Sequence, residues 1–505
     1  MSLAANQARR RQWIEIAPVA LLAASAVLAL VLVGVNRPGW SNAATTYALA
    51  AGLAAVLAGL VWSVVRRGGA IALLSPVALA CFVHFFLGYV TPILAADLGD
   101  GIFVKTANWT RQADPVPLMN RTLILAILCA LAIGAGFHAP LSRRLAAGIA
   151  ERLRRTGWIR RAPEANFVVL IAMLGIAVGA VLIQVRLGVF GYSSNYQALF
   201  EFAAYRRVLD LCVSLLALCL FLLALRAFAQ GRAGRPSYGS YLLMMAVFGI
   251  HIAIGLLTGF KGQVVMPAVI VGVAYFMIYR RAPLILGVLG VVLLVFAYSV
   301  VEPFRELRYA RSNFQSNSLA SIVNTMMEAG QTERSGSPNT GRRFLQRSEL
   351  ISPTSAALQH ADGLRAAGER APHFAEAIVL APALAFVPRA IWPDKPIYQF
   401  GKWFAMSVLR QPATMINSVG MGPISYFNYM GGFLAALAGF FAIGVLMRLL
   451  WSGLTPLGAG GWLMYLAVLQ PLVTLPGEVG PVFTGIIQML PLAMLAQYVV
   501  LRRSP

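Results

Sequence analysis

Long apolar stretches separated by short polar loops dominate this chain. Each stretch is about twenty residues long, which is the length an α-helix needs to cross the ~30 Å hydrocarbon core of a bilayer. An outer-membrane barrel would instead show alternating segments of about ten residues. The pattern therefore predicts twelve transmembrane helices. They are expected at residues 15–35, 46–65, 70–95, 121–140, 166–188, 209–228, 240–259, 263–279, 282–301, 423–446, 456–475 and 481–500.

Clusters of arginine indicate the orientation of these helices. Cytoplasmic loops of membrane proteins carry an excess of arginine and lysine, so Arg9, Arg10 and Arg11 predict a cytoplasmic N-terminus. With twelve helices the C-terminus is then cytoplasmic too, and every other short cluster falls on the same side. These clusters are Arg66/Arg67, the loop 141–165, Arg226/Arg232/Arg235, Arg280/Arg281, Arg448 and Arg502/Arg503.

The basic loop 141–165 has its own helical pattern. Apolar residues alternate with arginines at helical spacing, as in amphipathic helices that lie on anionic membrane surfaces. We expect it to lie on the inner leaflet; a site for a protein partner is the alternative.

One polar segment, 302–422, is much longer than the other loops and divides the chain into three parts. Residues 1–301 hold nine predicted helices and residues 423–505 hold three. Alternation places the segment in the periplasm. The predicted fold is thus an all-α, multi-pass protein of the bacterial inner membrane with one large periplasmic loop.

Short helices are predicted inside this loop. Ser352 followed by Pro353 is typical of an N-cap and a first helical position, which predicts a helix running to about Glu369. The apolar runs 374–387 and 397–409 are too short to span a bilayer and predict interfacial helices.

Composition agrees with a membrane protein. The chain of 505 residues is 59% hydrophobic and 12% charged, with a mean hydropathy of +0.73, whereas soluble domains are about one-quarter charged. The net charge of +23 is attributed mainly to cytoplasmic loops and not to nucleic-acid binding. All four cysteines lie in apolar runs and are expected to be packing residues. Without HExxH, paired acidic or CxxC motifs, no metal or cofactor is expected.

Three arginines follow the ninth predicted helix. Arg305, Arg308 and Arg311 recur every third residue, so they share one side of a helix that continues past Pro303. Guanidinium groups bind phosphate oxygens in a bidentate way. The stretch predicts a phosphate site; pairing with neighbouring glutamates is the alternative.

Two further candidates lie at predicted helix ends. Lys261 occupies a two-glycine turn between predicted helices seven and eight, and its ammonium could bind a ligand or extend to lipid headgroups. Arg186 precedes the sequence GVFGYSSNY, where Tyr192 is suited to stacking on sugars. An aromatic belt at the membrane surface is the alternative for the tyrosines.

The sequence FVPRAIWPDKPIYQFG combines charge with rigidity. Proline disfavours helix at the residue before it, so Pro388 should end an interfacial helix and hold Arg389 at the lipid boundary. Lys395 is expected to support that arginine. A structural loop corner is the alternative.

A general base has several candidates. His360 and His373 lie in the long loop, and imidazole titrates in the useful range. Glu376 is a competing carboxylate.

The order of these features resembles the oligosaccharide repeat-unit polymerases, the Wzy-type or O-antigen polymerase family. The resemblance is carried by residues 259–262, the arginines after predicted helix nine, Arg347, Pro388-Arg389 with Trp392-Pro393-Asp394-Lys395-Pro396, and Gly420, Tyr426, Asn428 and Gly431-Gly432.

The resemblance implies a GT-C-like architecture and metal-independent glycosyl transfer on the periplasmic face. Donor and acceptor would be oligosaccharides linked to undecaprenyl diphosphate. A membrane protein that regulates chain length would be a further partner. Catalysis would fall to Arg389, Arg305, His360, His373 and Glu376. Substrate binding would fall to Lys261, Arg308, Arg311, Arg186, Arg347, Tyr192 and Lys395.

Three other functions remain open. An O-antigen ligase would use a similar fold with lipid A core as acceptor, and a histidine near an arginine in the loop is typical of it. A lipid-linked oligosaccharide flippase or exporter would favour paired repeats and charges within the helices. A non-catalytic assembly or sensor protein is the third.

Overall fold

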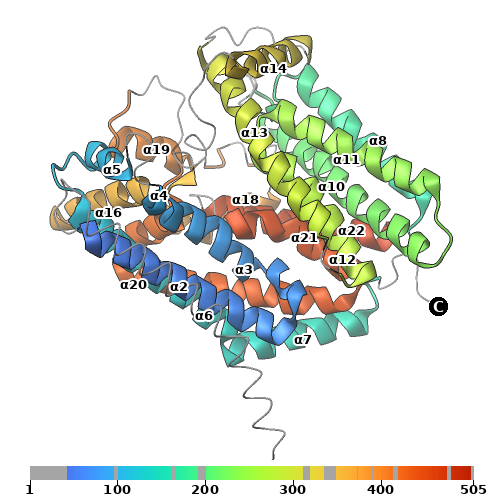
Figure 1. Ribbon diagram of the computed structural model, residues 1–505, viewed down its shortest axis with the longest axis horizontal. Coiled ribbons are helices and arrows are strands. Elements are labelled where there is room, and N and C mark those ends of the chain that lie inside the picture. Colours follow the sequence, from blue (N-terminus) through green and yellow to red (C-terminus); the bar gives the residue numbers. More distant parts are fainter. Residues whose placement is uncertain are drawn as a thin grey trace, which may run out of the picture.

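The structure is a computed structural model in which every regular element is helical over the residues it describes. These are 43–95, 101–160, 165–191, 201–281, 283–310, 319–334, 348–371, 373–387, 391–392, 394–396, 398–412, 419–474 and 479–501. The helices, shown in Figure 1, are α2 (Ala43–Gly68), η1 (Ala70–Leu74), α3 (Pro76–Ala80), η2 (Cys81–Val90), α4 (Thr91–Leu94), α5 (Ile102–Thr110), α6 (Val116–His138), α7 (Pro140–Thr156), α8 (Phe167–Arg186), α10 (Ala203–Arg232), α11 (Tyr238–Thr258), α12 (Lys261–Tyr279), α13 (Leu284–Ala310), α14 (Leu319–Arg334), α16 (Ile351–Ala366), α17 (Phe374–Val379), α18 (Ala381–Phe386), α19 (Phe400–Ser407), α20 (Gly422–Leu454), η4 (Thr455–Leu457), α21 (Ala459–Thr474) and α22 (Val479–Val500).

Ten helices in the described ranges are long and apolar enough to cross a membrane. Each coincides with one of the predicted runs, which confirms the membrane class. The predicted run 456–475 corresponds to α21, whose apolar part, Ala459–Val473, is shorter than the others. The predicted run 15–35 and the arginines before it lie outside the described residues.

Helices α6 and α20 pack closely together, and glycines make the approach possible. A β-carbon on Gly136 would lie 2.1 Å from the carbonyl oxygen of Phe441, and one on Gly444 would lie 2.1 Å from that of Ile133. Small residues permit such backbone contacts in membrane helices, where packing rather than hydrophobicity drives association. The two helices are therefore held backbone to backbone.

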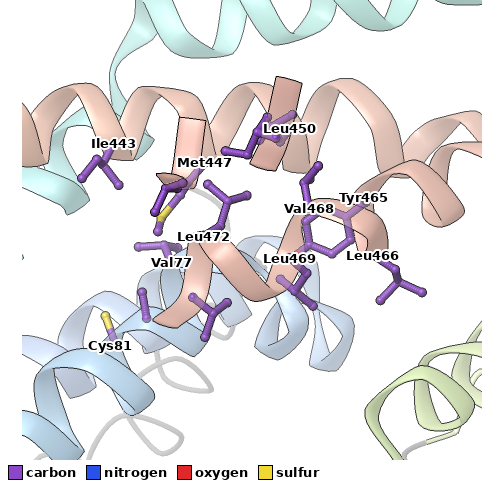
Figure 2. Packing of buried hydrophobic residues seen from close by; sticks show 14 of the residues in the cluster. Val77, Cys81, Ile443, Met447, Leu450, Tyr465, Leu466, Val468, Leu469 and Leu472 are labelled. Atoms are coloured by element: carbon purple, nitrogen blue, oxygen red, sulfur yellow. The ribbon is translucent and has the colours of Figure 1, made fainter. Parts of the chain in front are cut away.

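A dense apolar layer joins α20 to its neighbours. Figure 2 shows Met447 and Leu450 of α20 facing Leu472 and Val468 of α21, with Val77 of α3 beside them. All five side chains are buried. Helix α20 also packs on α6, so it lies between α6 and α21 (Figure 1).

The first part of the long loop continues a membrane helix. Helix α13 passes through Pro303 and ends at Ala310, so Arg305 and Arg308 share one helix as predicted. Helix α14 then turns back and packs on α13 (Figure 1). Arg311 lies outside the described residues, as does the side chain of Arg308.

Helix α16 confirms the predicted loop helix but not its predicted cap. The helix begins at Ile351, and the carboxylate of Glu349, not the side chain of Ser352, accepts a hydrogen bond from the Ser352 amide at 3.0 Å. Glu349 is buried in an ion pair with Lys105 at 2.5 Å. The predicted N-cap was wrong because this buried carboxylate occupies the place of the cap.

The hydroxyl groups of α16 instead attach the helix to the bundle. Its first turn is buried, and three of its hydroxyl groups bond to hydroxyl groups on other helices. The pairs are Ser352–Thr106 at 3.0 Å, Thr354–Tyr89 at 3.0 Å and Ser355–Thr122 at 2.9 Å. A helix in the long loop is thus docked between α5 and α6.

The predicted interfacial segments are helical. The run 374–387 forms two short helices, α17 and α18, and α19 lies within the predicted run 397–409. Val387 is extended, with φ −84° and ψ 113°, as expected for a residue before proline. Pro388 and Arg389 lie outside the described residues.

We predict that Gly136→Ala destabilises the protein by about 2 kcal/mol, because the added methyl group meets backbone atoms that have no rotamer with which to move away. The measurement is thermal unfolding of the purified protein in detergent. Gly175→Ala in α8 is the matched control, since nothing lies within 4 Å of its β-carbon position. Equal midpoints for the two variants would contradict the proposed packing constraint.

Candidate active site

A cavity of about 670 Å³ lies between α16, α17 and α20. Charged side chains are more frequent among the residues that line it than in the chain as a whole. The polar residues that line it are Arg365, Glu369, Arg370, His373, Glu376 and Tyr429.

A break in α20 forms one wall of the cavity. Gly431 and Gly432 have non-helical backbone angles, and Gly432 has φ +71°, a conformation that glycine adopts without steric cost. In an unbroken helix the carbonyl of Asn428 would accept from the amide of residue 432. Here Arg365 Nη1 donates to that carbonyl at 3.1 Å. The break therefore gives Arg365 a fixed position on α20.

The carboxylate of Asp362, which is itself bound by a second arginine, also holds Arg365 in place. Its Nη2 donates to Asp362 Oδ1 at 2.6 Å, and Arg121 of α6 binds the same carboxylate. Partial burial alone would raise the pKa of Asp362, but the hydrogen bonds and charges of Arg121 and Arg365 outweigh it and keep that pKa below its ordinary value. One ionised carboxylate thus joins α6 to α16 beside the cavity.

His373 and Glu376 form a close pair at the other wall. His373 Nδ1 lies 2.6 Å from Glu376 Oε2, and this bond keeps the pKa of Glu376 below its ordinary value. With Glu376 ionised, Nδ1–H is the donor. His373 has φ +61°, a left-handed conformation that is uncommon outside glycine and often found at functional sites.

His360 lies behind the wall and not in it. Its Nδ1 is 3.1 Å from the hydroxyl of Tyr429, which lines the cavity, and its ring meets Trp403 edge-on at 5.8 Å between centroids. Partial burial lowers the pKa of His360, so the imidazole is neutral near pH 7. This histidine is placed to orient Tyr429 and not to contact a ligand in the cavity.

Aromatic rings fix the elements around the cavity. Phe374 of α17 stacks on Tyr429 at 5.0 Å and meets Tyr426 at 4.9 Å, and the Tyr426 hydroxyl donates to the Phe374 carbonyl at 2.7 Å. Helix α17 is too short to be stable alone. Its position beside α20 depends on these contacts.

Lys395 has a structural position. Its Nζ donates to the carbonyls of Leu384 at 2.5 Å and Val387 at 3.0 Å, at the C-terminal end of α18. A cation at that end also complements the helix dipole. Lys395 therefore supports the segment that leads to residue 389.

A second group of predicted residues lies elsewhere, where α11, α12 and α13 meet. Gly259, with φ +74°, ends α11, and Lys261 begins α12, so the predicted tight turn is present. Arg305 Nε donates to the Gly259 carbonyl at 2.8 Å and its guanidinium lies 5.8 Å from the Phe260 ring. Arg305 therefore braces the turn that carries Lys261.

This turn borders a second cavity, of about 370 Å³, within the helix bundle. Gln184 donates to Asp210 at 2.8 Å in its wall, and His251 faces it. Arg186 is exposed at the end of α8, near this wall. Gly191 approaches the backbone of Thr258 rather than open space. His373 and Glu376 thus line the larger cavity, whereas Lys261, Arg305 and Arg186 are not among the residues that line the second one.

Several predicted residues have no described position. Arg389, Arg311, Arg347 and Tyr192 lie outside the described residues, together with the side chain of Arg308. Conversely, Arg365, Arg370 and Asp362 were not singled out by sequence. Their signal was present in the Gly431-Gly432 pair and in the charged end of the predicted loop helix, but nothing in the sequence connects the two.

A protein family described as a domain of unknown function (DUF8712) matches residues 178–455. The match covers more than half of the chain and contains every residue that lines the larger cavity. No curated protein matches the chain, and no solved structure matches it.

The Arg121–Asp362 pair gives a prediction about pH. Because the pKa of Asp362 is lower in the folded state, the stabilisation should be present above about pH 4, near the ordinary aspartate pKa, and disappear as pH falls through the folded-state value. Both side chains are more than one-third exposed, at 53% and 38%, so we expect at most about 1 kcal/mol.

The measurement is a double-mutant cycle of Arg121→Gln and Asp362→Asn by thermal unfolding at a series of pH values from 7 down to 2. Coupling should be full at pH 7 and should fall within the part of this series below about pH 4, as Asp362 becomes protonated. Coupling that stays constant over the whole series would contradict a role for the carboxylate charge.

Proposed function

We propose that this chain, which belongs to the DUF8712 family, is a membrane glycosyltransferase that uses lipid-diphosphate-linked oligosaccharides. The substrates proposed are undecaprenyl-diphosphate-linked repeat units, which the protein would polymerise for O-antigen, capsule or exopolysaccharide. The supporting observation is one cavity that holds two guanidinium groups and a histidine–glutamate pair.

The arginines suit the donor in this proposal. Transfer of a sugar from a lipid diphosphate leaves negative charge on the departing phosphate, and fixed cations stabilise that charge without a metal. Arg365 is held by Asp362 and the Asn428 carbonyl, which leaves part of its guanidinium fork for phosphate oxygens. Arg370 lines the same cavity and makes no ion pair with the described residues.

The histidine suits the acceptor. With Nδ1–H donating to Glu376, the free lone pair of His373 lies on Nε2. Nε2 would remove the proton from the attacking sugar hydroxyl as the new bond forms at the anomeric carbon. The bond from that carbon to the diphosphate breaks, and the electron pair leaves with undecaprenyl diphosphate. Glu376 would orient the imidazole and stabilise its charged form.

The remaining predicted residues keep their roles as proposals. Arg389 and Arg305 are proposed to act in catalysis. Substrate binding is proposed for Lys261, Arg186, Arg308, Arg311, Arg347 and Tyr192.

The proposal also includes the membrane topology and the architecture. We propose that the protein lies in the bacterial inner membrane with twelve spans, a GT-C-like arrangement, a periplasmic long loop and cytoplasmic termini. On this topology the larger cavity faces the periplasm, and a chain-length-regulating membrane protein would be a further partner.

Two alternatives have a specific observation in their favour. A ligase would need a histidine beside arginines, and His373 shares its cavity with Arg365 and Arg370. A flippase or exporter would need charge within the bundle, and Asp210 and Arg206 line the second cavity.

We predict that His373→Ala lowers polymerisation at least about 100-fold, because the proposed general base is lost. Single repeat units should then accumulate on the lipid. The measurement is the size distribution of lipid-linked oligosaccharide in a deletion strain that carries each variant at equal membrane abundance. Arg365→Gln should act in the same direction, through weaker stabilisation of the leaving group.

Arg155→Gln on α7 is the matched control, since that arginine is exposed and paired with Glu151. It should give polymer of normal length. Normal polymer from His373→Ala would rule out this residue as the base. The deletion strain itself separates the alternatives, because unattached lipid-linked polymer indicates a ligase and cytoplasmic repeat units indicate a flippase.

A further inference from the structure

Three arginines from three helices meet at the end of α6 that lies far from the larger cavity. Arg121, whose carboxylate partner Asp362 lies beside that cavity, is in the first turns of α6, and His138 is its last residue. Seventeen residues of helix separate them, or about 26 Å, which is close to the thickness of a bilayer core. If α6 spans a bilayer, the three arginines at its His138 end therefore lie on the opposite side of the membrane from Arg121.

The arginines are arranged around Phe137 and His138. Arg67 Nη1 lies 3.0 Å from His138 Nδ1, and Arg143 donates twice to the His138 carbonyl, at 2.8 and 3.1 Å. The guanidinium of Arg448 lies 5.1 Å from the Phe137 ring. Helices α2, α7 and α20 each supply one cation. We call Arg67, Arg143 and Arg448 the α6-end cluster.

His138 does not neutralise this charge. Ser63 donates its hydroxyl to the Leu60 carbonyl, so its oxygen accepts from His138 Nε2–H at 2.8 Å. Nδ1 is then the acceptor for Arg67, which makes the imidazole neutral. The histidine positions Arg67 without adding a negative charge.

No carboxylate of the described residues pairs with the α6-end cluster. The nearest acid along α7, Glu151, is bound to Arg155 at 2.8 Å and lies 3.8 Å from Arg154. Arg448 Nε is buried and has no hydrogen-bond partner within the same residues. Three like charges held together in this way are stabilised by an anion that accepts from several guanidinium forks, and phosphate has the matching geometry.

The surface beside the cluster indicates where the phosphate comes from. Helix α7 buries Ala146 and Ala150 but exposes Leu141, Leu145 and Ile149, which are 63%, 46% and 37% exposed. These three residues recur every fourth position and form an exposed apolar stripe along one side of α7. Figure 1 shows α7 alongside α20, away from α5, α16 and α19. Cations at the end of a membrane-length helix, followed by a helix with an exposed apolar side, are typical of a site at a lipid headgroup.

We propose that the α6-end cluster binds the phosphate headgroup of an anionic phospholipid. This site is separate from the proposed catalytic cavity and does not depend on glycosyl transfer. It would tie α2, α6, α7 and α20 together through a shared anion.

The test is the rise in thermal midpoint when lipid is added to the purified protein in detergent. Phosphatidylglycerol should raise the midpoint more than phosphatidylcholine does. The variant Arg67→Gln/Arg143→Gln should lose at least half of this difference. Arg155→Gln, on the same helix but paired with Glu151, should retain it.

Two further arms make the result decisive. Inorganic phosphate alone should give no comparable rise, and an equal rise would overturn a lipid source. The charge-retaining variant Arg67→Lys/Arg143→Lys should keep more of the difference than the glutamine variant. Native mass spectrometry should show fewer retained phosphatidylglycerol molecules for the glutamine variant than for Arg155→Gln, and equal retention would overturn the assignment.

Discussion

The backbone contact between α6 and α20 is the constraint on which both functional ends of the molecule depend. Gly136 and Gly444 let the two helices touch near one end, and α6 then reaches Asp362 with Arg121 near the other. Any widening of this pair would move Arg448 away from Phe137 and Arg121 away from the larger cavity. The two proposed sites, at opposite ends of α6, therefore share one packing contact.

The larger cavity exists because α20 stops being helical where α16 meets it. Gly431 and Gly432 have non-helical backbone angles, and Arg365 donates to the Asn428 carbonyl at the end of the preceding turns. Arg365 is thus positioned by a contact with the backbone of α20 as well as by Asp362.

The two arginine groups differ in what surrounds them. Arg365 has a carboxylate neighbour that fixes it, and its remaining donors are those assigned to the substrate in the proposed function. The α6-end cluster has no such neighbour among the described residues, so its anion would be a lasting part of the structure. The different roles proposed for the two arginine groups rest on this difference in neighbouring charge.

The sequence by itself determined the membrane class, the ten described spans, the tight turn at Lys261 and the helical segments of the long loop. These features follow from local periodicity, chain length and turn chemistry, which act over a few residues. It also contained the spacing of His373 and Glu376, three residues apart, although it did not indicate that they would bond. Only the tertiary structure decided that Arg365 meets the broken helix, that His360 lies behind Tyr429, and that Arg67 and Arg448 join Arg143 around Phe137 and His138. Such contacts depend on how helices pack across the bundle, and no local pattern records which helix faces which.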